Sequence, residues 1–351
     1  MKQLLTQLAL VLVSIAAAIV LIMLGLYACG YPAHRILTLW AGGAIATRFD
    51  IAVSLKIACP LMLTGLAAGI AFRCGVINIG AEGQSLIGAL AAAAFATAVA
   101  PSLPSSVAIP LALLAAILAG AAWAAIAALL DRYRGVPVVL STILLNFIAL
   151  QCVKIMLEGP TGPLKDPLTG VPQSRLLPAA YHLPLLPPAT GMSSLHIGIF
   201  VALAAALIAW LIQSRTTFGF ELRVTGLNPT AARLAGIPVA ARQLSVMLLS
   251  GGLAGLAGAI QLLGITHILG ISQPGIGYAG IAVALLGRLH PAGIILAALF
   301  FGMLDNGATN VEISRYGLPH DTADIVKGII VLCILVGAAY ISRHGIIAKE
   351  R

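Results

Sequence analysis

Long apolar runs separated by short polar segments constrain the fold of this 351-residue chain more than any other feature. Hydrophobic residues make up 60% of the sequence and charged residues 9%, whereas soluble domains carry about 25% charged residues. A helix needs roughly 20 apolar residues to cross the hydrocarbon layer, where its backbone polar groups must be satisfied internally. We therefore expect an all-α, polytopic membrane bundle, a single transmembrane domain over residues 1–351. About ten spans are expected, near residues 4–28, 51–72, 84–100, 106–130, 136–157, 194–212, 243–264, 277–288, 291–307 and 322–341.

The first apolar run has two interpretations, a cleaved signal peptide or a membrane helix. It extends over residues 4–28, which is longer than the apolar core of roughly 7–15 residues in a signal peptide. The length favours a first membrane helix, which we adopt.

The basic residues indicate an orientation for the bundle. Cytoplasmic segments of membrane proteins are enriched in Lys and Arg, so a net charge of +9 needs no nucleic acid to explain it. With both termini in the cytoplasm, the inner segments carry twelve basic residues and the outer segments five. The inner set is Lys2, Arg73, Arg132, Arg134, Arg215, Arg223, Arg233, Arg242, Arg288, Arg343, Lys349 and Arg351; the outer set is Arg35, Arg48, Lys165, Arg175 and Arg315.

Two glycine-rich segments interrupt the apolar pattern at residues 75–83 and 270–280. Each contains an Ile-Gly-x-x-Gly step, at 79–83 and 276–280, and each leads into an Ala- and Leu-rich helix. Interrupted helices at matching places in two halves suggest inverted repeats around a central pathway. From the topology above, we expect the first segment on the cytoplasmic side and the second on the outer side.

The longest Pro-rich interval, residues 158–193, cannot be a membrane helix, because proline lacks a backbone donor and has a fixed φ angle. It contains prolines at positions 160, 163, 167, 172, 178, 184, 187 and 188. We expect it to be an extracytoplasmic loop.

A basic stretch at residues 213–242 is expected to be a cytoplasmic loop with one short helix. Asn228 suits the N-cap and Pro229 the first helical position. Gly236 is a natural residue just beyond the C-terminus. A helix of about two turns is marginal in water by itself, so we expect it to dock on this chain or on a partner. An ordinary basic loop is the alternative.

Polar side chains within or beside the spans are candidates for a solute pathway, because such groups are costly in lipid unless they face a cavity or a partner. The candidates are Asn78, Glu82, Gln84, Asn146, Asp305 and Asn306. Structural alternatives stay open: Glu82 as a cap for its own helix, and Asn146 as a bridge between helices. No catalytic Ser-His-Asp or paired-carboxylate pattern stands out, and the cysteines show no metal-ligand spacing.

The sequence resembles the membrane permeases of ATP-binding-cassette importers for nucleosides and simple sugars, in the group that includes ribose and branched-chain amino-acid permeases. The resemblance spans about residues 60–340. It is carried by LTGL at 63–66, AFRCG at 71–75, NIGAEGQ at 78–84, STILLNFIA at 141–149, TFGFELR at 217–223, GLNP at 226–229, AARLAGI at 231–237 and GIAVALLGR at 280–288, with His290-Pro291 behind it.

The resemblance implies that the short helix is a coupling helix seated in a cytoplasmic ATPase. The residues it assigns to coupling are Glu221, Arg223, Asn228, Pro229, Ala232, Arg233 and Gly236. It further implies separate ATP-binding subunits that hold ATP and Mg²⁺, a second permease that is a paralogue or an identical copy, an extracytoplasmic solute-binding protein, and the bacterial cytoplasmic (inner) membrane. The solute it favours is a nucleoside, ahead of a simple sugar.

One segment departs from the resemblance. Residues 136–139 read Val-Pro-Val-Val, where relatives more often have a polar or acidic residue with Asn. This puts the local pathway chemistry in doubt.

Two other function classes, an ion-coupled secondary transporter and a membrane enzyme, fit the sequence less well. The chain lacks the phosphate-binding motif G-x-x-x-x-G-K-[ST], so we expect no ATP hydrolysis by this chain itself. An ion-coupled secondary transporter would also use interrupted helices, but it needs no docking helix. A membrane enzyme would need a cluster of His, Asp or Glu at the membrane face.

Overall fold

The computed structural model describes residues 16–99, 103–158, 162–187, 191–271, 275–314, 316, 318 and 322–343. Over these residues the regular structure is helical, apart from three isolated β-bridges. The expected all-α class is therefore confirmed for the described part. The chain divides into two compact units: Met1–Ser54 with Phe300–Arg351 is unit 1, and Leu55–Leu299 is unit 2.

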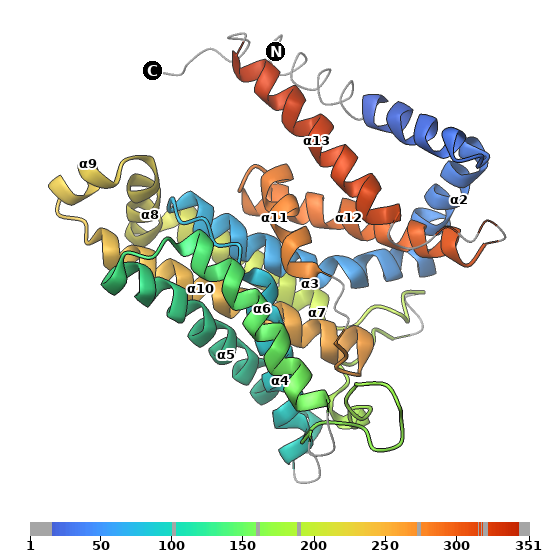
Figure 1. The fold of residues 1–351 in the computed structure, drawn as a ribbon, viewed down its shortest axis with the longest axis horizontal. Coiled ribbons are helices and arrows are strands. Elements are labelled where there is room, and N and C mark those ends of the chain that lie inside the picture. Colours follow the sequence, from blue (N-terminus) through green and yellow to red (C-terminus); the bar gives the residue numbers. More distant parts are fainter. Residues whose placement is uncertain are drawn as a thin grey trace. The chain divides into compact units, whose positions relative to one another are not determined.

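Unit 2 is a helical bundle (Figure 1). Small residues allow its helices to pack closely. Helices α10, α5 and α4 form its centre, where a Cβ on Gly255 would overlap the backbone of Ala116 and one on Gly258 that of Ser85. Backbone approach of this kind is how membrane helices associate in lipid. Its helices are α3 (Arg48–Arg73, from residue 55), α4 (Ala81–Val99), α5 (Ser105–Arg134), α6 (Val138–Leu157), α7 (Gly198–Arg215), α8 (Thr217–Leu227), α9 (Pro229–Leu234), α10 (Val239–Gln261), α11 (Ile276–Leu286) and α12 (Pro291–Glu312, up to residue 299).

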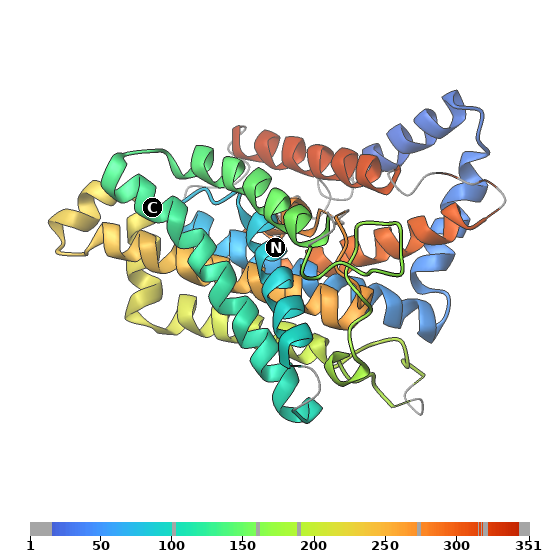
Figure 2. The same ribbon diagram turned by 60° about the horizontal axis from the view of Figure 1, so that its bottom comes forward.

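The Pro-rich segment is irregular over residues 162–187, apart from a short 3-10 turn, and it is fastened to the C-terminal end of α10. Backbone hydrogen bonds run from Ser174 to Leu269 (2.8 Å) and from Leu183 to Leu263 (2.9 Å). The rings of His182 and His267 stack with centroids 3.8 Å apart. Burial, together with the neighbouring His182 and Lys56, lowers the pKa of His267. In Figure 2 this segment lies at the opposite end of α10 from α8 and α9.

Unit 1 contains the helical residues Ala16–Ala28, then α2 (Ala33–Ile45), the start of α3, the end of α12, and α13 (Thr322–Arg343). Helix α2 lies between the first two spans expected from the sequence, which assigned no helix to it. In α2 the residues Ile36, Trp40 and Ala44 are buried four positions apart and form an apolar stripe. The segment is short, and Arg35, Gly42 and Gly43 interrupt its apolar sequence.

Six of the described helices are long and apolar enough to cross a membrane: α3, α5, α6, α7, α10 with its π-helical extension to Thr266, and α12. Two further apolar helices, Ala16–Ala28 and Ile276–Leu286, are shorter. The chain is thus a multi-pass helical membrane protein. Residues 1–15 of the first expected span lie outside the described residues. The count of ten spans stays a prediction.

Candidate functional site

The two glycine-interrupted segments meet inside unit 2. Helix α3 ends at Arg73, and α4 begins at Ala81 after a non-helical stretch. Helix α11 begins at Ile276, one residue after Gly275, whose φ of +65° suits glycine. A Cβ on Gly277 would overlap the backbone of Ala81 and Glu82, so the two helix starts touch only because this residue is glycine. Away from this contact the two segments diverge: Gly75 packs against Gly226 at the end of α8, whereas Gly270 pairs with Gln173 of the Pro-rich segment. The expectation that they belong to opposite sides of the membrane stays a prediction.

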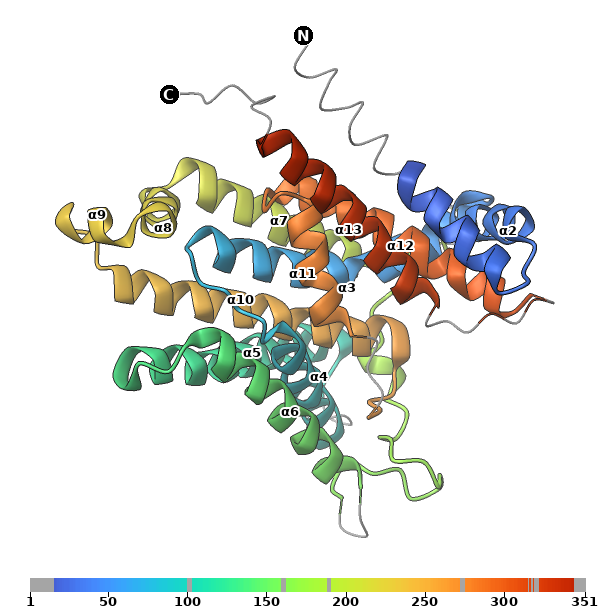
Figure 3. The same cartoon turned by 45° about the horizontal axis from the view of Figure 1, so that its top comes forward.

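Glu82 caps a helix, but not its own. Its buried carboxylate accepts a hydrogen bond from the backbone amide of Gly277 (2.8 Å), and the amide of Tyr278 also donates to it. These two amides belong to the first turn of α11, which carries the positive end of the helix dipole. Figure 3 shows α11 in the neighbourhood of α3, and the hydroxyl of Thr64 donates to the Ile276 carbonyl at 2.9 Å. A carboxylate and a hydroxyl from distant segments thus fix the start of α11.

Asn78 and Gln84 are fully buried and bind one another. The Asn78 amide nitrogen donates to Gln84 Oε1 (3.1 Å) and to Ser250 Oγ (2.9 Å). The Asn78 oxygen accepts from the Gly80 amide (2.8 Å) and from Gln84 Nε2 (3.2 Å). The pair therefore closes the stretch between α3 and α4 and ties it to α10. Whether either side chain contacts solute stays a prediction.

Asn146 on α6 joins the two helix starts. Its buried side-chain oxygen accepts from the Gly83 amide (2.9 Å), and its nitrogen donates to the Ile79 carbonyl (3.1 Å) and to the Tyr278 hydroxyl (3.2 Å). The bridging role considered from the sequence is present. Tyr278 is 49% exposed and was not among the predicted residues. The only signal for it was an aromatic residue inside the second Ile-Gly-x-x-Gly step.

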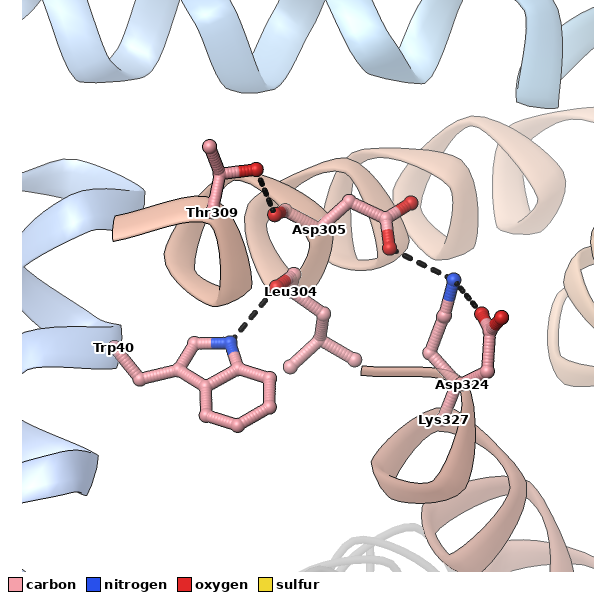
Figure 4. A network of polar contacts seen from close by, with 6 residues as sticks. All are labelled: Trp40, Leu304, Asp305, Thr309, Asp324 and Lys327. Atoms are coloured by element: carbon pink, nitrogen blue, oxygen red, sulfur yellow. Dashed lines mark hydrogen bonds and ion pairs between the residues drawn. The ribbon is translucent and has the colours of Figure 1, made fainter. Parts of the chain in front are cut away.

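The other two predicted pathway residues, Asp305 and Asn306, belong to unit 1. Figure 4 shows Lys327 of α13 between Asp305 (2.7 Å) and Asp324 (2.6 Å), with the Trp40 indole donating to the Leu304 carbonyl. These contacts connect α12 with α13 and with α2.

Asn306 is buried and holds three segments of unit 1 together. Its amide nitrogen lies within 2.7 Å of the Gly43 carbonyl, 2.9 Å of the Asp50 carbonyl and 3.1 Å of Ser54 Oγ. The six predicted residues thus fall into a group of four in unit 2 and a pair in unit 1. Their contact with solute stays a prediction.

The predicted short helix is present as α9, and its caps are confirmed. Asn228 Oδ1 accepts hydrogen bonds from the amides of Thr230 (3.1 Å) and Ala231 (3.0 Å), and Pro229 opens the helix. Gly236 has φ +79°, and its amide donates to the Arg233 carbonyl at 3.0 Å. The surrounding stretch is more helical than the loop that was expected, since α8 precedes α9 and α10 already begins at Val239.

The residues assigned to coupling differ in whether their side chains are free to contact a partner subunit. Ala232 is fully buried in its own unit, Glu221 forms an ion pair with Arg242, and Arg223 donates to the Gln213 carbonyl (2.6 Å). The most exposed apolar side chains here are Leu227 and Leu234, each 86% exposed. The sequence did not single them out, because leucine is an ordinary helix former.

A hollow of about 320 Å³ opens near the same end of unit 2. It is bounded by the end of α5, the start of α6, the start of α10 and residues 75–77. Pro137, Val138 and Val139 line it, so the departure noted in the sequence falls on a real cavity, with Asp131 and Gln243 among its polar neighbours.

A multi-pass bundle with two interrupted helices joined at a buried polar crossing, and with a capped helix exposed at one end, belongs to the class of membrane permeases. Residues 50–335 match the model of the family described as the permease component of the branched-chain amino acid transport system, and the chain belongs to that family.

Curated relatives extend the match over most of the chain. It is 37% identical to the guanosine ABC transporter permease protein NupP of Bacillus subtilis, over 95% of this chain and 93% of that protein. It is 34% identical to the glucose ABC transporter permease protein TsgB13 of Haloferax volcanii, over 88% and 81% respectively. A second B. subtilis guanosine permease protein, NupQ, is 32% identical over 72% of this chain and 79% of its own length.

Proposed function

We propose that this chain is the transmembrane subunit of an ATP-binding-cassette importer that carries a nucleoside inward by alternating access. Separate subunits bind ATP and Mg²⁺, and this chain holds no cofactor of its own. The names of the two B. subtilis relatives, both guanosine permease proteins, support this choice of solute. The glucose permease of H. volcanii supports the alternative, a simple-sugar importer.

The observation that carries the proposal is the occupied N-terminus of α11. A helix start with free amides attracts anions, so it would suit a phosphate or the carboxylate of an amino acid. Here the Glu82 carboxylate already takes the amides of Gly277 and Tyr278. A second anion would find these two amides already hydrogen-bonded, and the Glu82 carboxylate would repel it. The crossing therefore suits an uncharged solute such as a nucleoside or a sugar, even though the family description refers to amino acids.

The short helix α9 supports the proposal that a soluble ATP-binding subunit drives transport from outside the membrane. The helix presents Arg233 and Leu234 outward, while the buried Ala232 fastens it to its own unit, and the exposed Leu227 lies just before it at the end of α8. An exposed pair of leucines flanking a capped, two-turn rod fits a groove on a soluble ATP-binding subunit. An ion-coupled transporter would have no use for it.

The remaining parts of the proposal follow from the charge pattern and the family. Twelve inner against five outer basic residues support cytoplasmic termini, about ten spans, and a place in the bacterial inner membrane in contact with lipid. The paired interrupted helices support inverted repeats. Two distinct guanosine permease proteins in one bacterium support a second permease that is a paralogue, with a homodimer as the alternative. An extracytoplasmic solute-binding protein completes the assembly.

Uptake in intact cells tests the transport activity. Cells expressing the chain with its ATP-binding, second-permease and binding-protein subunits should accumulate [³H]guanosine, and excess glucose or leucine should not compete. Accumulation should stop when the ATP-hydrolysing residue of the ATP-binding subunit is replaced. Competition by glucose alone would favour the sugar importer, and uptake on an ion gradient without ATP-binding subunits would establish a secondary transporter.

Co-purification tests the docking role of α9. Leu234→Ser should reduce recovery of the ATP-binding subunit with the permease by about tenfold, since loss of one well-buried leucine from an interface costs roughly 1.5–3 kcal/mol. The matched control is Leu168→Ser, a 91% exposed leucine in the Pro-rich segment at the other end of unit 2. Equal recovery in both variants would remove α9 from the interface.

A further inference from the structure

Tyr278 has an unusual position for an exposed aromatic side chain in this bundle. It lies in the first turn of α11, at the crossing of the two interrupted helices, and about half of its surface is uncovered. The residues on either side of it in the crossing, Glu82 and Asn146, are buried. The ring is therefore the part of this polar crossing that is most open to a visiting molecule.

The orientation of the ring is set by buried groups. Its hydroxyl receives a hydrogen bond from Asn146 Nδ2 at 3.2 Å. Asn146 cannot turn freely, because its other contacts hold the Gly83 amide and the Ile79 carbonyl at the start of α4. Both interrupted segments thus help to fix one tyrosine ring.

The surface that the ring presents is uncharged, and its one polar atom is the hydroxyl that Asn146 binds. The amides beside it already donate to Glu82, so the free recognition element is the π-face of the ring. One and two turns further along the same side of α11, Ile281 and Ala282 are half-buried and Leu285 is 37% exposed. A flat, neutral, aromatic group fits this surface, because base–aromatic stacking needs only a π-face.

We propose that Tyr278 is a substrate-contacting, specificity-determining residue that stacks on the base of the nucleoside in transit. This inference rests on the proposed function, and it adds a solute contact outside the six predicted pathway residues. It also predicts a preference: a purine, with its larger π-surface, should gain more from the stack than a pyrimidine.

The test compares variants in the assembled importer by uptake of [³H]guanosine and [³H]uridine. Tyr278→Leu should lower guanosine uptake about tenfold, the size expected for a single base–aromatic stack, and should lower the guanosine-to-uridine ratio. Tyr278→Phe keeps the ring and should retain most of the uptake and the ratio. The control is Phe147→Leu, which changes a 62% exposed aromatic next to Asn146 and should leave the ratio unchanged.

The guanosine-to-uridine uptake ratio separates stacking from a structural role, because a general loss of folding or assembly lowers the uptake of both solutes equally. An unchanged ratio in Tyr278→Leu, or loss of the second permease from the purified complex with a normal ratio, would overturn the inference while leaving the proposed function standing. If the unmodified importer takes up neither nucleoside, the proposed function fails first. Photolabelling with 8-azidoguanosine provides a direct second measurement: label on the peptide that contains Tyr278 is expected, and label that avoids this peptide contradicts the contact.

Discussion

Two short helices of unit 2, α9 and α11, use the same device in opposite settings. In each, a side-chain oxygen accepts hydrogen bonds from the amides of the first turn. For α9 the acceptor is Asn228, which immediately precedes the helix and is exposed. For α11 it is Glu82, 195 residues away in the chain and buried. A local cap shapes one helix, whereas a distant cap also joins two parts of the fold, so disruption of the second should have the larger effect.

The most damaging change should be Gly277→Ala. The added Cβ would overlap the backbone of Ala81 and Glu82, and backbone cannot move aside as the end of a flexible side chain can. We expect most of the folded permease to be lost, measured by size-exclusion chromatography of the detergent-solubilised complex. Gly328→Ala in α13 is the control, since nothing lies within 4 Å of its added carbon. Normal yield from Gly277→Ala would mean that the two helix starts do not touch.

A largely buried ion pair in unit 1 can be compared with the cap of α11. Lys327→Met removes the ammonium that contacts Asp305 and Asp324 and should cost about 3 kcal/mol of folding stability, the lower end of the range for a buried pair, because the two side chains of the Lys327–Asp305 pair are 10% and 16% exposed. Asp324→Ala should cost less than about 1 kcal/mol, because Asp324 is 70% exposed. Thermal unfolding of the complex in detergent measures both. Equal shifts in the two variants would show that Lys327 is held mainly by its solvated partner.

Removal of the distant cap should have an intermediate effect. Glu82→Ala leaves the buried amides of α11 without their acceptor, at a cost of about 1–3 kcal/mol. Glu82→Gln retains an acceptor oxygen and should cost less. Hydrogen exchange in the peptide over residues 276–286 should speed up in the alanine variant and largely recover in the glutamine variant. Unchanged protection in both would show that α11 is held by its other contacts, such as that of Thr64.

The smallest effect is expected for the local cap. Asn228→Ala should cost about 1 kcal/mol and increase hydrogen exchange over residues 229–235, whereas Asn228→Asp should preserve the cap. The rest of unit 2 should exchange as before. A loss of protection in α11 from this variant would contradict the distinction between a local and a distant cap.

The same distinction explains what could be predicted from the sequence. The bounds and caps of α9 are encoded within nine residues, from Asn228 to Gly236, so the sequence predicted them. The interruptions at 75–83 and 270–280 were visible as glycine clusters. Their contact with one another was not visible, because a local sequence pattern does not show which distant segment packs against a glycine. For the same reason, the sequence offered Glu82 as a pathway residue or as a cap for its own helix, but not as the cap of α11.

Two other omissions have separate physical causes. Helix α2 was missed because it has only 13 residues, fewer than a membrane span needs. The exposed leucines of the α8–α9 region were missed because exposure depends on tertiary packing, which leucine as a residue type does not reveal. Most span positions were predicted, since a long apolar run needs no knowledge of its neighbours.

The fastening of the Pro-rich segment to the end of α10 has a practical consequence for tolerance to inserted sequence. Residues 174–183 share backbone hydrogen bonds with residues 263–269, and the chain then runs on to α11. Extra residues between Ser174 and Leu183 would break the register of that pairing at both of its ends. The stretch around Leu168, which is 91% exposed, is the better place for an epitope tag or a protease site.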